Sequence, residues 1–390
     1  MIQDIINASL EKEKSTICCV NNQPCLFNHS VIAHTVAEIL LCHFSPVDST
    51  KEKSTMFLNE NQVIPKSFPV QPRKTYSQQW TSYNQAQTNE KTRFLELLFE
   101  LCSQIDEMPK AHTGRNRIPL ADMVFAVVYK IYSGVSGRRF MSDLTEAQKK
   151  GYISKIPHFN SLFNYLEIDE IHYILKDLIT ESAKPLRAIE FNFAVDSSGF
   201  GKSNTKIAWT TAKYRDKNVQ IQDWLKCHLI CGVTTNIVTS VEITNGQASD
   251  SPYFKPLVDA TAQHFEIQQV SADKAYLSVD NLRAVENVGG MPFIPFKENS
   301  RPNHRTKDSL WRNLYYFYHL HNDKFKAFYH RRSNVETTFS MIKKKFGDKL
   351  KSKTEKAQIN ELLCKVLCHN LCCVVQSIYE LGIETDFYRE

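Results

Sequence analysis

Three acidic side chains occupy positions from which they could act together on a phosphodiester bond. Asp196 follows a short predicted strand at 191–195, and Asp273 follows another at 267–272. Transfer at a phosphodiester needs the attacking oxygen activated and the leaving oxygen neutralised, and two divalent ions held about 4 Å apart by carboxylates do both. Glu336, in a stretch with helical spacing, is the candidate for the third carboxylate, and we call these residues the acid trio.

The elements that must position the trio follow one another in a definite order. In chain order they are strands at 191–195, 225–233 and 237–244, a helix at 251–264, a strand at 267–272, a helix at 277–287 and a strand at 292–296. Three sequential strands followed by alternating helices and strands is the element order of the ribonuclease H architecture, a mixed sheet with helices packed on its faces. In that order the first and fourth strands are parallel neighbours, so Asp196 and Asp273 should meet at one sheet edge.

The segment around Glu336 carries cations at helical spacing. From Tyr329 to Lys343 the chain reads Tyr-His-Arg-Arg-Ser-Asn-Val-Glu-Thr-Thr-Phe-Ser-Met-Ile-Lys. In a helix, Arg332, Glu336 and Lys343 share one face while Val335 packs inward. That face offers a metal ligand flanked by two cations suited to phosphate oxygens.

The same segment carries a family resemblance. The spacing Y-x2-R-x3-E-x6-K, formed by Tyr329, Arg332, Glu336 and Lys343, resembles the signature of bacterial insertion-sequence transposases of the DDE class. Two more blocks look like that family's aspartate motifs: Ala-Val-Asp-Ser-Ser-Gly at 194–199 and Ser-Ala-Asp-Lys-Ala-Tyr at 271–276. The similarity runs from about residue 88 to residue 382.

The resemblance implies a fold, a reaction and partners. It implies that the acid trio binds two Mg²⁺ ions, with Mn²⁺ as a substitute, and that Tyr329, Arg332 and Lys343 contact phosphates near the transposon end. The implied enzyme is a DNA endonuclease and polynucleotidyl transferase for cut-and-paste transposition: water cleaves at the end, and the freed 3′-hydroxyl attacks a target strand. No nucleotide cofactor is implied. The implied partners are double-stranded DNA and a second copy of the chain, in a bacterial cytoplasm beside the nucleoid.

Further basic residues are candidate phosphate contacts. Residues 343–356 carry seven lysines, and Lys344 and Lys345 come first after the signature lysine. Such a run is either a phosphate-tracking patch or a solvated helix end. Arg138 and Arg139 open a short helix after a glycine-containing turn, an outline shared by DNA-binding helix-turn-helix motifs and by any small helical bundle.

The chain divides into regions of different composition. They are an N-terminal arm at 1–44, a polar linker at 45–89, a helical DNA-binding region at 90–186, a catalytic domain at 187–382 with a small insertion at about 298–328, and a tail at 383–390. Within the helical region, helices are predicted at 90–104, 119–132, 138–150 and 161–181. The predicted fold class is therefore α/β: a ribonuclease H-like mixed sheet flanked by helices, preceded by an α-helical region.

Composition excludes other classes of protein. The net charge of +6 is modest for 390 residues and decides little by itself. Eleven cysteines in a chain without a signal-peptide pattern favour reduced thiols in a cytosol over a disulfide framework. No run of about 18 apolar residues predicts a membrane span, and the nearest candidate, 359–381, carries charged residues and is interpreted as a buried helix.

Several suggestive residues have structural interpretations. Cys18, Cys19 and Cys25 lack the spacing of a zinc site. The run that begins at Cys364 and repeats every four residues is typical of core packing. The remaining two are Trp311, for which packing is favoured over stacking on an unpaired base, and Asp250, which is expected to cap the helix that starts at Ser251-Pro252.

Two rival functions remain open. One is a nuclease of the ribonuclease H fold that cleaves without joining, and a strand-joining assay separates it from a transposase. The other is a transposase-derived regulator that only binds DNA. Three converging carboxylates weaken that second hypothesis because binding alone has no chemical need for them.

Overall fold

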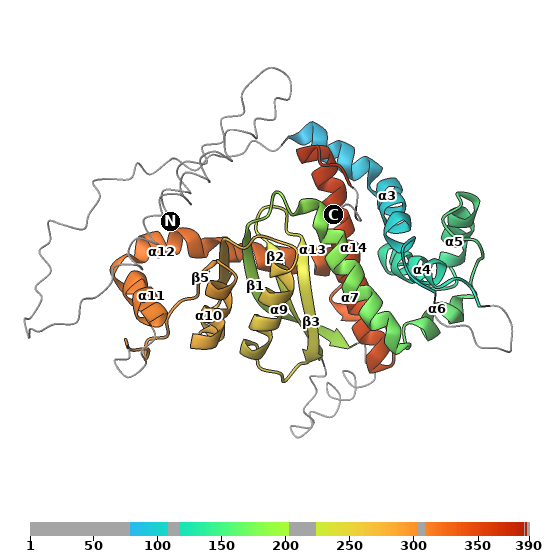
Figure 1. Cartoon of the computed structure of the whole chain (residues 1–390). Coiled ribbons are helices and arrows are strands. Elements are labelled where there is room, and N and C mark those ends of the chain that lie inside the picture. The colour runs from blue at the N-terminus through green and yellow to red at the C-terminus, as the bar shows by residue number, and fades with distance from the viewer. Residues whose placement is uncertain (1–78, 108–116, 203–223, 303–308, 386, 388–390) are drawn as a thin grey trace, which may run out of the picture. The chain divides into compact units, whose positions relative to one another are not determined.

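The computed structural model describes residues 79–107, 117–202, 224–302, 309–385 and Phe387, all within one compact unit that begins at Tyr76 (Figure 1). In chain order its elements are α3 (Trp80–Cys102), α4 (Leu120–Ser133), α5 (Phe140–Lys149), α6 (Phe159–Tyr165), α7 (Asp169–Ala183), η1 (Lys184–Leu186), β1 (Asn192–Lys202), β2 (Trp224–Gly232), β3 (Val238–Asn245), η2 (Ser251–Tyr253), α9 (Phe254–Ala262), β4 (Gln269–Ala272), η3 (Lys274–Tyr276), α10 (Val279–Asn287), β5 (Met291–Phe293), α11 (Ser309–Leu320), α12 (Asn322–Tyr329), η4 (His330–Arg332), α13 (Ser333–Phe346), β6 (Lys349–Leu350) and α14 (Glu355–Leu381), where η marks a short 3-10 helix. The N-terminal arm with its cysteines lies outside the described residues.

The strands form one mixed sheet in the order β3-β2-β1-β4-β5, and β6 pairs with β1. The predicted hairpin is confirmed, because β1, β2 and β3 pair antiparallel in sequence. Strand β4 pairs parallel with both β1 and β5. The last residues in register between β1 and β4 are Val195 and Ala272. Asp196 and Asp273 therefore each stand one residue beyond the shared ladder, on neighbouring strands.

Strand β1 is longer than predicted. The sequence placed its end at residue 195, but it continues to Lys202. Serine and glycine have low strand propensity, so the Ser-Ser-Gly-Phe-Gly stretch gave no strand pattern. Pairing with neighbouring strands stabilises this extension despite its low strand propensity. Asp196 lies opposite Leu229 of β2, and Gly201 lies opposite Lys349 of β6. Asp196 is thus fixed inside a strand rather than at its loose end.

Two predicted helix boundaries are wrong. Helix α3 begins at Trp80, inside the stretch predicted to be a polar linker. The sequence did not reveal this start because the first turns of the helix are largely exposed and carry no apolar periodicity. The helix predicted at 161–181 is two helices, α6 and α7. The chain bends between them, where the side-chain amide of Asn360 in α14 donates a hydrogen bond to the carbonyl of Leu166 at 2.9 Å. A long-range contact that local periodicity does not encode sets this break.

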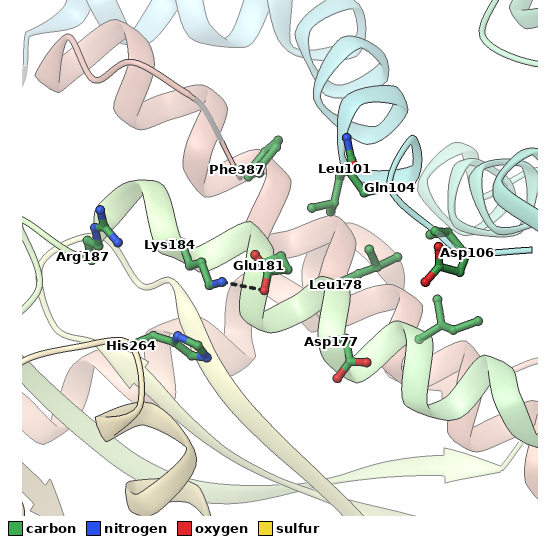
Figure 2. Close-up of a pocket in the computed structure, with 12 residues that line it drawn as sticks. Leu101, Gln104, Asp106, Asp177, Leu178, Glu181, Lys184, Arg187, His264 and Phe387 are labelled. Carbon is green, nitrogen blue, oxygen red and sulfur yellow. Dashed lines mark ion pairs between the residues drawn. The ribbon is translucent and has the colours of Figure 1, made fainter. Parts of the chain in front are cut away.

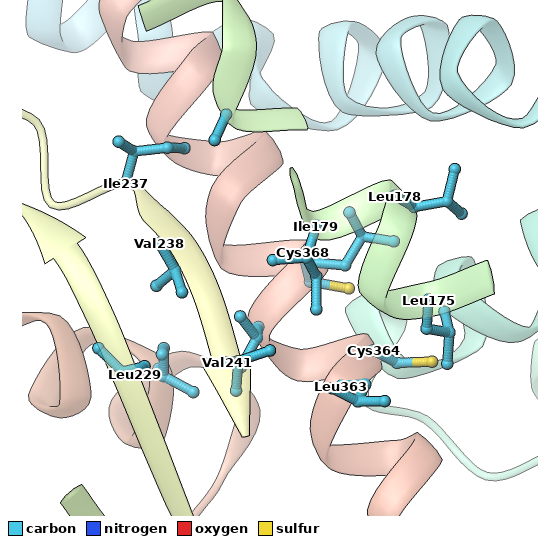
Figure 3. Packing of buried hydrophobic residues seen from close by; sticks show 14 of the residues in the cluster. Leu175, Leu178, Ile179, Leu229, Ile237, Val238, Val241, Leu363, Cys364 and Cys368 are labelled. Carbon is cyan, nitrogen blue, oxygen red and sulfur yellow. The ribbon is translucent and has the colours of Figure 1, made fainter. Parts of the chain in front are cut away.

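Helix α14 is the central element of the core. It packs against α3, α4 and α7 and also against β3. Figure 3 shows α14, α7 and the β2–β3 hairpin contributing to one cluster, with labelled residues Leu175, Leu178, Ile179, Leu229, Ile237, Val238, Val241, Leu363, Cys364 and Cys368. By length and composition α14 could cross a membrane, yet 78% of its most apolar window is buried inside the protein. The boundary predicted between residues 186 and 187 falls inside this continuous core.

The cysteines of α14 belong to this packing. Cys364 and Cys368 are fully buried, and burial raises the pKa of both thiols. The Nε2 atom of His369 lies 2.9 Å from the carbonyl oxygen of Asn236. Because a carbonyl oxygen can only accept a hydrogen bond, Nε2 is the donor. Burial lowers the pKa of His369 to about 4. The hydrogen bond of His369 joins α14 to the turn of the β2–β3 hairpin.

Candidate active site

The acid trio converges from two strands and one helix. The Oδ1 atom of Asp196 in β1 accepts a hydrogen bond of 2.8 Å from the backbone N–H of Ser197. Asp273 caps η3, accepting the N–H of Lys274 at 2.6 Å. Glu336 stands in the first turn of α13 and is exposed. The predicted adjacency of the two strand-end aspartates agrees with the parallel register of β1 and β4.

One guanidinium bridges two members of the trio. Arg332 donates from Nη1 to Oδ2 of Asp196 at 3.0 Å and from Nη2 to Oε1 of Glu336. Because the two nitrogens belong to one rigid fork, Asp196 and Glu336 are held on the same cation. The sequence predicted that Arg332 contacts a phosphate beside the carboxylates. In this structure it lies between two of the carboxylates and pairs with both.

The charges of Asp273 and Glu336 act on the ionisation of Asp196. Burial raises the pKa of Asp196, while the N–H of Ser197 and the charge of Arg332 oppose the rise. The negative charges of Asp273 and Glu336 raise it further. A carboxylate near others attracts cations, and Arg332 is the cation that pairs with both Asp196 and Glu336.

Helix α13 is anchored so that its charged face meets β1. Val335 and Ile342 are fully buried on the inward face, as the helical spacing predicted. The side-chain amide of Asn334 donates to the carbonyl of Val233 at the end of β2. The hydroxyl of Thr338 lies in the interior, 3.4 Å from the sulfur of Cys231 in β2. These contacts fix the rotation of α13 and therefore the direction of Glu336.

Tyr329 and Lys343 lie close to Arg332 and to β1, respectively. The guanidinium of Arg332 lies 6.0 Å from the ring centre of Tyr329. The pKa of Tyr329 is raised by burial and, against the lowering effect of Arg332, by Asp273 and Asp196. Lys343 donates to the hydroxyl of Ser198 at 2.7 Å, two residues beyond Asp196. Arg332 and Lys343 therefore contact neighbouring residues of β1, while Glu336 and Tyr329 are connected to that strand through Arg332.

The outlying basic residues differ in their surroundings. Lys344 is exposed, whereas Lys345 is paired with Glu90 of α3 and lies 3.3 Å from the sulfur of Cys372. Lys345 therefore ties α13 to α3 and α14. Arg138 and Arg139 are exposed at the start of α5, and Arg138 lies over the ring of Phe159 at 5.1 Å.

Asp250 does not cap η2, contrary to the sequence prediction. Its side chain makes no capping hydrogen bond there. Instead Oδ1 accepts from the hydroxyl of Ser197 at 2.7 Å and from the ammonium of Lys226 at 3.2 Å. The available signal was the period-2 placement of Lys226 and His228 in an otherwise apolar strand, which marks a polar face on β2 beside β1. Sequence reasoning missed this cluster.

The insertion between the second and third acids packs on the sheet. Trp311 of α11 donates its indole N–H to the carbonyl of Arg301 at 3.0 Å and lies edge-on to Phe296, with ring centres 5.0 Å apart. This agrees with the packing interpretation of Trp311. A separate hollow of about 680 Å³ lies beside α7 and the end of α3, where Lys184 pairs with Glu181 (Figure 2). None of the acid trio lines it.

The donor set of the trio suits a hard divalent cation, which prefers carboxylate oxygens. Within the described ranges, no three His, Cys, Asp or Glu side chains are arranged as a ready metal cluster. Asp196 and Glu336 are both paired with the guanidinium of Arg332 in this structure.

Comparison with known proteins gives one family and one solved structure. No curated protein matches the chain. The cryo-EM structure of the piggyBac transposase synaptic complex with hairpin DNA is similar with a TM-score of 0.36 and 11% sequence identity, covering 79% of this chain and 77% of that one. The family model described as the transposase DDE domain matches residues 192–371, the stretch that holds Asp196, Asp273 and Glu336.

Proposed function

We propose that this chain is a DDE transposase that cleaves DNA at transposon ends and transfers the freed strand into target DNA by a cut-and-paste route. The observation that carries the proposal is the convergence of the acid trio within the segment that matches the transposase DDE domain. Asp196 and Asp273 stand past the same parallel ladder, and Arg332 links Asp196 to Glu336. The Tyr-Arg-Glu-Lys signature and a bacterial insertion-sequence origin are part of the same proposal.

We further propose that the sheet is of the ribonuclease H type. The strand order β3-β2-β1-β4-β5, with β1 between an antiparallel and a parallel neighbour, supports this. Such a sheet places the end of the β1–β4 ladder, where Asp196 and Asp273 stand, at a point where a helix packed across it can add a third ligand. Helix α13, anchored on β2 through Asn334, meets that requirement.

The trio would hold two Mg²⁺ ions, or Mn²⁺ in their place. When bound, the ions would activate the attacking oxygen and neutralise the leaving one. The protein's own groups do the rest. Arg332, released from a carboxylate, pairs with a phosphate oxygen as a planar two-pronged donor, and Lys343 adds a point charge beside β1. Tyr329 supports Arg332 with its ring.

In the proposed reaction, water attacks phosphorus at the transposon end and the 3′-oxygen leaves as a hydroxyl. That 3′-hydroxyl then attacks a target phosphodiester, so each step forms one phosphorus–oxygen bond and breaks one. The proposed partners are double-stranded DNA and a second copy of this chain, because both ends must be processed together. A complex with one chain for each pair of ends, measured by gel filtration, would contradict the dimer.

Lys343→Ala is expected to weaken binding to transposon-end DNA and to flatten its salt dependence. Losing one phosphate contact should lower the slope of log affinity against log salt by about one, so the loss is greatest at low salt. Fluorescence anisotropy between 50 and 200 mM salt, roughly the range in which such slopes are resolved, measures this. Lys255→Ala on α9, whose ammonium pairs with Asp259, is the matched control. If Lys343→Ala binds DNA with the affinity and salt dependence of wild type, Lys343 does not contact a phosphate.

A strand-joining assay tests the function itself. Purified protein, labelled end DNA and a target plasmid are combined with Mg²⁺, and both cleaved ends and joined products are measured. Joined products support a transposase. Cleavage without joining would point to the nuclease alternative, and DNA binding without either product would point to a regulator.

A further inference from the structure

A buried tyrosine hydroxyl at the edge of the acid trio has no hydrogen-bond partner. Tyr276 ends η3, three residues after Asp273, and its side chain is 1% exposed. Among the described residues nothing completes a hydrogen bond to its hydroxyl. A buried donor without a partner costs free energy that a phenylalanine would not, so a role in packing alone does not account for the hydroxyl.

The surroundings of this hydroxyl are acidic. The pKa of Tyr276 is raised by burial and then by the negative charges of Asp196, Asp250 and Asp273. The side chain of Ser197 opposes the rise through a hydrogen-bonding contact that does not reach the geometry of a formed hydrogen bond. The charges that act on this hydroxyl are therefore those of three carboxylates, two of them members of the trio, and Ser197 is the side chain that comes nearest to pairing with it.

Ser197 connects these groups. Its backbone N–H donates to Asp196 at 2.8 Å and its hydroxyl donates to Asp250 at 2.7 Å. The Ser197 hydroxyl donates its only hydrogen to Asp250. Its oxygen lone pairs can therefore accept a hydrogen bond from the hydroxyl of Tyr276. Asp250 is in turn held by Lys226, whose ammonium lies 3.2 Å from it and also donates to the carbonyl of Ala248 at 2.7 Å.

A buried histidine lies on the far side of this network. The Nδ1 atom of His228 lies 3.4 Å from Asp250, and its Nε2 is 2.9 Å from the hydroxyl of Thr244. The ring stacks on Tyr253 with centres 4.5 Å apart. Burial lowers the pKa of His228 to about 4, so the ring is neutral at pH 7 and Lys226 is the cation that balances Asp250. Asp250 is consequently a fixed anchor.

We propose that Tyr276 and Asp250 are positioning residues for Asp196 and act on it through Ser197. In the described state Arg332 holds one oxygen of Asp196 and the N–H of Ser197 holds the other. If a divalent ion took the place of Arg332, a hydrogen bond from Tyr276 to Ser197 would complete the chain that ends on Asp250 and would hold the strand that carries Asp196. This inference rests on the proposed metal-binding function of the trio.

The test measures Mn²⁺ binding by electron paramagnetic resonance, and the free energy of unfolding without metal, for wild type and Tyr276→Phe. Loss of an outer hydrogen bond typically weakens metal binding by roughly 10- to 100-fold, and we expect a loss in that range. Without metal, Tyr276→Phe should be as stable as wild type or more so, because it removes an unpartnered donor. Asp250→Asn, which keeps an acceptor for Ser197 but loses the charge, should weaken Mn²⁺ binding in the same direction.

Tyr253→Phe is the matched control, because it removes a tyrosine hydroxyl from the same cluster while keeping the stack on His228. It should bind Mn²⁺ as wild type does. Wild-type Mn²⁺ affinity in Tyr276→Phe, or a loss of affinity that follows a loss of stability, would overturn the inference and leave the proposed function standing. A wild-type protein that binds no Mn²⁺, or binds it equally after Asp196→Asn, would overturn the proposed function and this inference with it.

Discussion

Asp196→Asn is expected to slow cleavage of transposon-end DNA by roughly a thousandfold or more while leaving the protein folded. Charge stabilisation by bound ions is worth several kcal/mol in the transition state, and about 4 kcal/mol corresponds to a factor of roughly a thousand in rate. Asparagine keeps the size of the side chain and an acceptor for the N–H of Ser197 but removes the charge that binds a cation. Single-turnover cleavage of labelled DNA measures the effect.

The stability of this variant separates catalysis from structure. Burial raises the pKa of Asp196 above its ordinary value. A carboxyl group with a raised folded-state pKa binds protons more tightly in the folded state, so its ionisation as the pH rises through that pKa opposes folding. At pH 7 the free energy of unfolding of Asp196→Asn should therefore equal or exceed that of wild type, as measured by urea denaturation.

The control for this substitution is Asp259→Asn on α9, where the carboxylate is 44% exposed and pairs with Lys255. It should retain full cleavage, because surface pairs of this kind contribute little. Cleavage by Asp196→Asn at the wild-type rate, or a loss of cleavage that is matched by unfolding, would mean that Asp196 is not a metal ligand in the reaction.

Lys365→Met is expected to lower the free energy of unfolding by about 3–5 kcal/mol, the usual cost of removing one partner from a buried charge pair. Lys365 is 2% exposed, and its ammonium donates to the carbonyls of Gly347 at 3.0 Å and Lys349 at 2.8 Å. Glu361, also buried, lies 3.7 Å away and would lose its nearest cation. Methionine fills the space but leaves these acceptors without a donor.

This loss also reaches the candidate site. Gly347 ends α13 with a positive φ of 83°, and Lys349 begins the strand that pairs with β1 at Gly201. Loosening this junction frees the end of α13 that carries Lys343. Urea denaturation measures the loss, with exposed Lys353→Met as the control expected to stay within about 0.5 kcal/mol of wild type. A change of less than about 1 kcal/mol in Lys365→Met would contradict the proposed role.

Strand order allowed the relation between Asp196 and Asp273 to be predicted. Parallel neighbours end at the same sheet edge, so two strand-end acids had to lie together once β1 and β4 were assigned. The spacing of Arg332 and Glu336 similarly predicted one helix face. Nothing local says which strand that face will meet. The bridge from Arg332 to Asp196 joins residues 136 positions apart and becomes visible only in the folded structure.

Asp250 shows the opposite limit of sequence reasoning. An aspartate before Ser-Pro is a strong local capping signal, and the structure overrides it with contacts from Ser197 and Lys226, on two different strands. The extension of β1 to Lys202 has the same origin, because pairing with β2 and β6 outweighs weak strand propensity. Where long-range pairing competes with a local signal, the local signal alone is insufficient.

The central claim is tested most directly by excision and reinsertion of a marked element that carries the gene's own flanking DNA. Wild type is compared with Glu336→Gln and with Glu286→Gln, an exposed glutamate of α10 outside the site. The account predicts excision and reinsertion with wild type and with Glu286→Gln, and neither with Glu336→Gln. Reinsertion by Glu336→Gln at the wild-type frequency would contradict the assignment of the acid trio.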